Sequence, residues 1–149
     1  MYDLLIFLIL VVMGYVIGTY VEKRHYRSIK QREQAFLQLA AVTMKTSHYP
    51  SEKVKSAELV YGSAVISIDY FKRLLASLRN IFGGTVKSYE TLIDRARREA
   101  LLRMKEMANG AKVIVNVRIE TATIGRKAGK KGVGCVEAFA YGTALTLEE

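Results

Sequence analysis

The fold of this 149-residue chain is decided by one stretch, YETLIDRARREALLRMKEMANGAKVIVNVRIETAT (residues 89–123). Its first part predicts a helix that starts at Ser88, because apolar residues recur at helical spacing and charged residues take the other side. Asn109 and Gly110 are typical of a helix C-terminus. The apolar period then falls from 3.6 residues to 2, which predicts a strand with one solvated face. On this strand we expect one side to carry Val113, Val115, Val117 and Ile119.

Three more strands and a second helix are expected around this stretch. Residues 134–147 form the partner strand, after a glycine- and lysine-rich connection. Upstream, residues 35–45 and 54–68 are rich in β-compatible residues, and the turn between them holds Pro50, so we predict two strands joined by a turn. A helix is expected from Asp69 to about Phe82, where Gly83 and Gly84 end it. The predicted fold class is therefore α+β, with the order β-β-α-α-β-β.

The N-terminus is predicted to cross a membrane. Residues 4–21 carry no charge, and eighteen residues of helix span about 27 Å, close to the thickness of the hydrocarbon core. No Lys or Arg precedes the run and no cleavage site follows it, so we expect a retained signal anchor rather than a removed export signal. A buried core helix is disfavoured because the run is apolar on every face. The expected parts are an anchor (1–21), a basic juxtamembrane helix or linker (22–34) and a domain (35–149).

Basic residues follow the anchor and predict its orientation. Lys and Arg exceed Asp and Glu between residues 22 and 34, an excess that the positive-inside rule assigns to the cytoplasm. We therefore expect a single-pass protein of the cell membrane with a cytoplasmic C-terminal domain. The residues nearest the anchor are candidate contacts for acidic lipid headgroups, and the alternative is a topology signal on a solvated helix face. These candidates are Lys23, Arg24 and Arg27.

Two glycines within the anchor are candidates for helix packing. Gly14 and Gly18 are four residues apart and so lie on one helical face. Small residues at this spacing let the backbones of membrane helices approach closely. Because glycine is common in membrane helices, the signal is weak.

Metal and enzyme chemistry find little support in the sequence. The transition-metal ligand types other than carboxylates are Cys135, His25 and His48, which share no ligand spacing, and a single cysteine excludes an intrachain disulfide. We interpret Cys135 as a small buried hydrophobe. The run GRKAGKKG (residues 125–132) departs from a phosphate-binding loop in spacing and context, and no serine has a nucleophile-elbow pattern. We expect no catalytic residue, no resident metal, no cofactor and no enzyme activity.

Three segments resemble the YbjQ family, small bacterial and archaeal proteins described as heavy-metal-binding. They are GSAVIS (62–67), LRNIFGGTVKSYETLIDRARREALLRMKEMANGAKVIVNVRIE (78–120) and AYGTAL (140–145), and the resemblance covers about Leu39 to Leu147. Residues 1–34 and 85–87 depart from the family pattern. The resemblance implies an α+β fold that assembles into ring-like homo-oligomers, with five subunits expected, and no demonstrated reaction.

Two hypotheses for the function follow. The first is a scaffold or interaction protein, in which the anchor tethers a self-assembling ring, or a pair of rings, that presents a repeated surface to an unknown protein partner. Self-assembly is expected from the domain alone, because Tyr61, Phe139 and Tyr141 are apolar side chains on strands that helices cover on one face only.

The second hypothesis is an anion- or metal-binding module. It would use symmetry-related metal ligands or a cationic ring rim built from the connection between the last two strands, whose candidate anion contacts are Arg126, Lys127, Lys130 and Lys131. The alternative is a solvated hairpin tip. Nucleic acid is not an expected partner, because no aromatic side chain in this connection offers base stacking. The net charge of +9 favours anionic neighbours without naming one.

Overall fold

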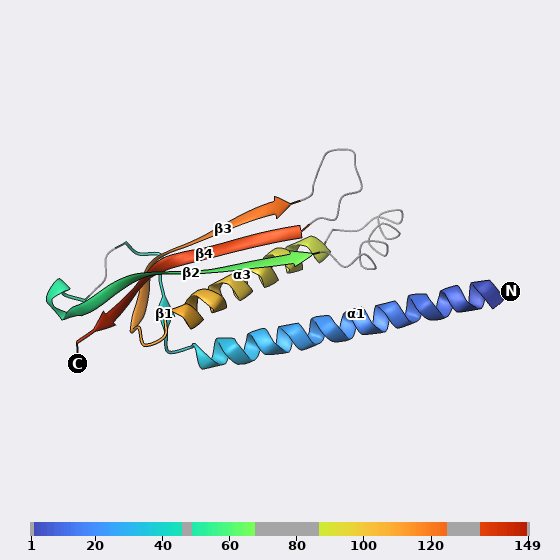
Figure 1. Cartoon of the computed structure of the whole chain (residues 1–149), viewed down its shortest axis with the longest axis horizontal. Helices are drawn as coiled ribbons and strands as arrows, with labels where there is room; N and C mark the ends of the chain where they lie inside the picture. Colours follow the sequence, from blue (N-terminus) through green and yellow to red (C-terminus); the bar gives the residue numbers. More distant parts are fainter. Residues whose placement is uncertain (1, 46–48, 68–86, 125–134, 149) are drawn as a thin grey trace.

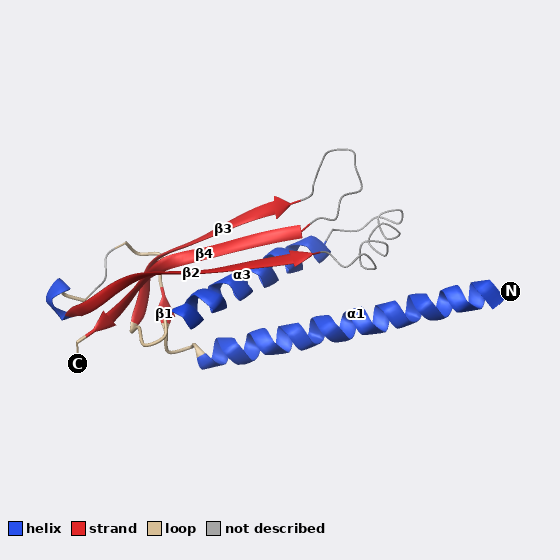
Figure 2. Cartoon of the chain, in the orientation of Figure 1, coloured by secondary structure: helices blue, strands red, loops and turns tan. Residues whose placement is uncertain are grey.

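The computed structural model describes residues 2–45, 49–67, 87–124 and 135–148, which form three layers (Figure 1). A long helix, α1 (Tyr2–Ala35), lies along a second helix, α3 (Lys87–Met107), and α3 in turn covers one face of a four-stranded sheet. The strands are β1 (Ala40–Ala41), β2 (Val54–Ser67), β3 (Val113–Ile124) and β4 (Cys135–Leu147), and a short 3-10 turn, η1 (Ser51–Lys53), precedes β2 (Figure 2). The predicted α+β class is confirmed.

The sheet has the strand order β1-β3-β4-β2. Its centre is β4, which runs antiparallel to both β2 and β3, so Tyr141 has Tyr61 on one side and Arg118 on the other. The predicted strands at 54–68 and 134–147 are confirmed within one residue. One long side of β2 faces no other strand among the described residues.

The strand predicted at residues 35–45 is wrong in both length and pairing. Helix α1 continues to Ala35, and β1 covers only Ala40–Ala41, parallel to β3 at the opposite edge from β2. The backbone just after β1 also bonds to β3, because the Val42 amide donates to the Ile114 carbonyl at 2.9 Å and the Val42 carbonyl accepts from the Val117 amide at 3.0 Å. The backbone groups of residues 40–42 thus find their hydrogen-bond partners on β3. This segment therefore does not pair with β2 as a hairpin.

A β-bulge in β3 changes which valines share a face. Asn116 has a φ of 53°, and the register with β4 shifts between Val115 and Arg118. The added residue turns the strand over: Val117 packs with Ile114 in the core under α3, whereas Val113 and Val115 belong to a second cluster on the other face. The prediction that Val113, Val115, Val117 and Ile119 share one side is therefore wrong.

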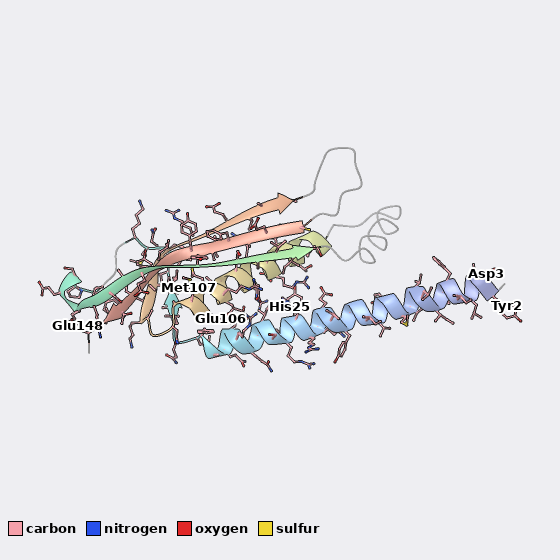
Figure 3. The ribbon with its side chains drawn as sticks, in the orientation of Figure 1. Tyr2, Asp3, His25, Glu106, Met107 and Glu148 are labelled. Atoms are coloured by element: carbon pink, nitrogen blue, oxygen red, sulfur yellow. The ribbon has the colours of Figure 1, made fainter. Side chains whose placement is uncertain are left out.

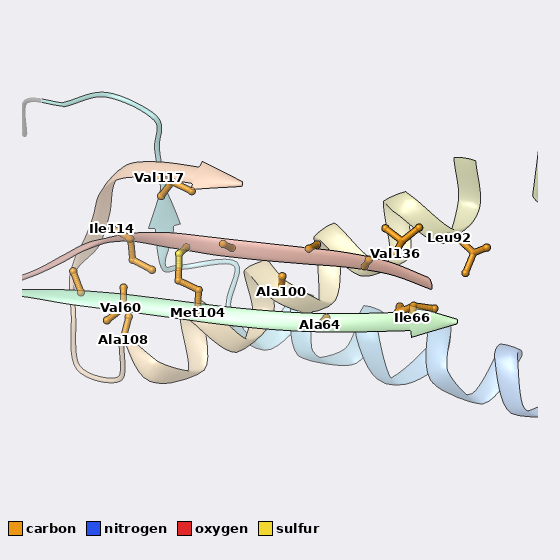
Figure 4. Packing of buried hydrophobic residues seen from close by; sticks show 14 residues of the cluster. Val60, Ala64, Ile66, Leu92, Ala100, Met104, Ala108, Ile114, Val117 and Val136 are labelled. Carbon is orange, nitrogen blue, oxygen red and sulfur yellow. The ribbon is translucent and has the colours of Figure 1, made fainter. Parts of the chain in front are cut away.

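Small side chains allow α3 to pack closely on the sheet (Figure 4). Several alanines are fully or nearly fully buried where helix and sheet meet: Ala64, Ala96, Ala100, Ala138 and Ala140. At Gly62 of β2 there is no room even for a methyl group, because a Cβ atom would lie 2.4 Å from the carbonyl oxygen of Ala100. The helix ends as predicted, and Gly110 follows it with a φ of 85°.

The face of the sheet opposite α3 carries a row of aromatic side chains. The ring of Phe139 lies 6.0 Å from that of Tyr61 and 5.7 Å from that of Tyr141, centroid to centroid. Tyr61 is 52% and Phe139 39% exposed. As predicted, α3 leaves these residues uncovered. We call this side of the sheet the open face.

Some predicted features lie outside the described residues. These are the helix at 69–82 with its glycine pair, His48 in the turn after β1, and the connection that holds Arg126, Lys127, Lys130 and Lys131.

Candidate functional site

The second half of α1 is held against α3 by ion pairs between residues far apart in the chain. Arg32 donates hydrogen bonds to Glu99 and, at 3.0 Å, to Glu106. Arg98 donates two bonds to the carboxylate of Glu33, at 2.7 and 2.6 Å. We call this set, with the residues described below, the α1–α3 contact.

Apolar side chains and main-chain bonds complete this contact. Ile29 of α1 and Leu102 of α3 are buried, although neither belongs to the two core clusters of the sheet. At the end of the contact nearer the apolar run of α1, the hydroxyl of Tyr26 donates to the carbonyl of Thr91 at 3.3 Å. At the other end, Lys105 donates to the carbonyl of Phe36 at 3.1 Å. The two helices are therefore joined along their shared length.

Glu99 is the centre of the α1–α3 contact. Its side chain is 6% exposed and accepts bonds from Arg32 of α1 and from Arg103, which also donates to the carbonyl of Ser63 on β2 at 2.8 Å. Burial by itself raises the pKa of Glu99, but the bonds from Arg32 and Arg103 outweigh it and hold the pKa below the ordinary value. One carboxylate thus joins α1, α3 and, through Arg103, the sheet.

His25 lies between the two helices beside Glu99 (Figure 3). Its Nε2 is 3.9 Å from the Glu99 carboxylate, and its buried Nδ1 has no hydrogen-bond partner. Burial and the nearby positive charge of Arg95 lower the pKa of His25. Arg95 itself lies 3.7 Å from Glu22 and 5.8 Å from the ring centre of Tyr26. The neutral form of His25 therefore fits this contact better than the protonated form.

The two helices run in the same direction. Tyr26 meets Thr91 near the start of α3 and Arg32 meets Glu106 near its end, so both N-termini point the same way (Figure 1). The described part of α3 thus begins beside the first turns that follow the apolar run of α1. The sheet ends that hold Ser67, Ile124 and Cys135, paired to one another through β4, lie toward the same side (Figure 1).

Charged residues of α1 are sorted between two faces. Glu22 and Glu33 both point to arginines of α3. Lys23, Arg24 and Arg27 are exposed and, at about 100° per residue, lie on the opposite side of the helix. None of these three cations has an ion pair with a described carboxylate.

Gly14 and Gly18 lie on the same helical side as the α1–α3 contact. The spacing from Gly18 to His25, and from His25 to Arg32, is two helical turns, so the three positions are nearly in line. A second membrane helix that packed on these glycines would therefore approach α1 from the same side as α3 and the sheet of this chain.

The part of the chain after α1 matches a known family. A family model described as "Putative heavy-metal-binding" matches residues 39–148. The chain belongs to the YbjQ family. The match begins after Ala35, so α1 lies outside it.

Proteins similar to this YbjQ chain carry names without an assigned activity. A UPF0145 protein of Hahella chejuensis is 41% identical over 97 residues, which make up 64% of this chain and 86% of that protein. A UPF0145 protein of Pyrococcus furiosus is 36% identical over 110 residues, 72% of this chain and 90% of that protein. A solved structure of a DUF74-family protein of unknown function from Pediococcus pentosaceus covers 74% of this chain and 98% of its own, at 12% identity and a TM-score of 0.44.

The metal description of the YbjQ family finds no counterpart in the part of the chain that the structure describes. No group of three or more His, Cys, Asp and Glu side chains is placed there to hold an ion. His25 lies in the α1–α3 contact, outside the family match. Cys135, predicted to be buried, is half-buried on the open face, opposite Ser67 and Ile124. The expectation that no metal binds stays a prediction.

The sequence does not predict the α1–α3 contact. Its pattern indicates that the charges of α3 lie away from the apolar stripe and that those of α1 belong to a basic linker or a solvated face. Each helix carries one signal: Leu102 and Ile29 are apolar, yet charged residues stand three and four positions further along the helix, on the same face. Both are buried, and each lies on the side of its helix that carries the ion pairs of the contact.

Proposed function

We propose that this YbjQ-family protein is a membrane-anchored scaffold without enzyme activity. Helix α1 crosses the cell membrane once, the domain lies in the cytoplasm, and copies of the domain assemble into a cyclic ring, for which the family resemblance suggests five subunits. The observation that carries this proposal is the α1–α3 contact, because it fixes the domain rigidly to its anchor.

The membrane part rests on length, composition and charge. Helix α1 is long and apolar enough to cross a membrane, a test that a signal sequence also passes, and its apolar half is exposed in the single chain. The basic residues that follow favour a cytoplasmic domain. The continuity of α1 through the α1–α3 contact supports retention, since cleavage after the apolar run would separate a helix that the fold uses as one piece.

Self-assembly is supported by surfaces that one copy leaves open. The outer side of β2 offers unpaired backbone groups at one edge of the sheet, and beyond Val117 the opposite edge, β3, has no paired strand among the described residues. Register through β4 puts Tyr61–Ser67 of β2 level with Arg118–Ile124 of β3. The edge of β2 in one copy can therefore lie beside the edge of β3 in the next copy without a shift along the strands. Repetition of this contact gives a head-to-tail ring in which all anchors are parallel.

Topology is tested on the full chain in cells. Protease added to right-side-out vesicles should leave the domain intact and should digest it once the vesicles are permeabilised. Sequencing of the mature N-terminus should begin within the first residues. Digestion in sealed vesicles would contradict the orientation, and an N-terminus beyond residue 20 would contradict the anchor.

Assembly is tested by light scattering of the full chain in detergent. We expect one species of several copies that persists in the double variant Gly14→Leu/Gly18→Leu, because the domain drives assembly. The full chain is used because removal of residues 1–34 would uncover Leu102 and leave Glu99 without Arg32. A wild-type monomer would overturn the ring, and a monomer only in the double variant would assign assembly to the anchor.

A further inference from the structure

The α1–α3 contact leaves one side of α1 positively charged just beyond the apolar run. The acidic residues between positions 22 and 34 are Glu22 and Glu33, and both face arginines of α3. Their charge is therefore directed away from the opposite side of the helix, which carries Lys23, Arg24 and Arg27. We call these three residues the basic face.

The basic face lies at the depth of lipid headgroups in the proposed orientation. With a rise of about 1.5 Å per residue, its three residues lie roughly 3 to 9 Å beyond Val21, the last residue of the uncharged run. Each polar layer of a bilayer is about 5 to 8 Å thick, and long basic side chains can bend back toward it. All three side chains are exposed and have no described ion pair.

The opposite side of α1 cannot serve the same purpose. There α3 covers the helix from Glu22 onward, and hydrogen bonds hold the rotation of α1 relative to the domain. In the part of the chain that the structure describes, the basic face is therefore the charged side of α1 that stays open to headgroups at this level. Because the α1–α3 contact fixes this face before any lipid arrives, little ordering is left to oppose binding.

From this arrangement we propose that Lys23, Arg24 and Arg27 form a binding surface for the phosphate groups of acidic phospholipids in the leaflet next to the domain. The proposal rests on the proposed membrane insertion of α1. A basic residue near an acidic membrane surface contributes about 1 kcal/mol, which corresponds to a roughly fivefold preference for an acidic over a zwitterionic lipid at one headgroup position.

The experiment uses the full chain reconstituted in phosphatidylcholine vesicles that contain either spin-labelled phosphatidylglycerol or spin-labelled phosphatidylcholine. The fraction of motionally restricted label measures how strongly each lipid associates with the protein. We expect about fivefold preference for phosphatidylglycerol in the wild type, reduced toward equality in Lys23→Gln/Arg24→Gln/Arg27→Gln and weakened by added salt.

Lys30 provides the matched control. It is exposed on the same side of the same helix but lies roughly 13 Å beyond Val21, above the headgroup layer. Lys30→Gln should keep the preference. Equal association of the two lipids in the wild type, or a preference that survives the triple substitution, would overturn the lipid surface. If neither lipid is motionally restricted, α1 does not insert into the bilayer. That result would contradict the proposed membrane anchor as well as the lipid surface.

Discussion

Arg32 of α1 and Glu99 of α3 are 67 positions apart in the chain and form a hydrogen-bonded ion pair whose carboxylate is buried. A charge is buried at such a position only where partners compensate for the lost hydration. Glu99 has such partners on both helices: Arg32 on α1, and Arg103 one turn further along α3. The pair therefore connects the part of the chain that the YbjQ family model matches to the helix that precedes it.

Substitution of Glu99 should loosen α1 from the domain. In Glu99→Ala, Arg32 and Arg103 lose their shared carboxylate, and we expect a loss of about 2 to 3 kcal/mol, less than for a fully buried pair because Arg32 is 28% exposed. Thermal unfolding in detergent, with the distance between spin labels on α1 and α3, measures the effect. Arg97→Ala, at an exposed position of the same helix, should change stability by less than about 0.5 kcal/mol. Equal effects of the two substitutions would contradict the role of Glu99.

Acid should weaken the α1–α3 contact in two steps. His25 has an ordinary pKa of 6.5 that burial and Arg95 lower in the contact, so its protonation opposes docking and the contact weakens as the pH falls below that value. Glu99 has a pKa below its ordinary 4.5, so its contribution is complete above that pH and is lost as the pH falls through the lowered value.

The same label distance, followed from pH 8 to pH 3, tests both steps. In His25→Asn the first step should vanish while the second remains, since Glu99 keeps its bonds from Arg32 and Arg103. A wild-type contact that is constant down to about pH 5 would show that His25 is not coupled to docking.

Gly62 should not tolerate even alanine. The new methyl group would meet the carbonyl oxygen of Ala100 and the amide nitrogen of Met104, backbone atoms that move only with the whole of α3. We expect Gly62→Ala to cost about 3 kcal/mol or more in the free energy of unfolding. At Gly110 there is open space and only a positive φ, so Gly110→Ala should cost about 1 kcal/mol. Denaturant titration compares the two, and the reverse order would contradict the packing of α3 on β2.

Purified protein should carry no stoichiometric zinc or copper. His25 and Cys135 lie on different elements and in different surroundings, and the described residues offer no third ligand to either. Elemental analysis of the full chain measures the content. About one ion per chain, lost in Cys135→Ser, would contradict the prediction and point to ligands shared between copies.

The sequence predicts those elements that depend on local pattern. The stripe of α3, the switch of period after Gly110 and the β-compatible composition of β2 each reflect neighbours within a few residues, and the structure places these elements where they are expected. The bulge at Asn116 is different, because a residue with positive φ reverses the faces of a strand without altering its apolar pattern.

The pairing of β1 and the α1–α3 contact depend on residues far apart in the chain. Ala40 and Ala41 have the composition of a strand, but their partners on β3 lie more than seventy positions away. The arginines and glutamates of α1 and α3 have the composition of solvated helix faces, and only their approach in space pairs them. For this reason Ile29 and Leu102, apolar positions on otherwise charged helix faces, are the better sequence signal of a buried helix face.

Helix α1 passes from its apolar half into the α1–α3 contact without a break. In the proposed orientation the domain therefore moves with the helix whenever the helix changes its tilt in the membrane. From Val21 to Ala35 the helix extends about 21 Å, so a change of roughly 10° in helix tilt displaces its far end by about 4 Å. Membrane helices adjust their tilt to bilayer thickness, and a flexible linker would absorb that movement. In the proposed orientation the thickness of the surrounding bilayer would therefore set the tilt of the sheet and of its open face relative to the membrane.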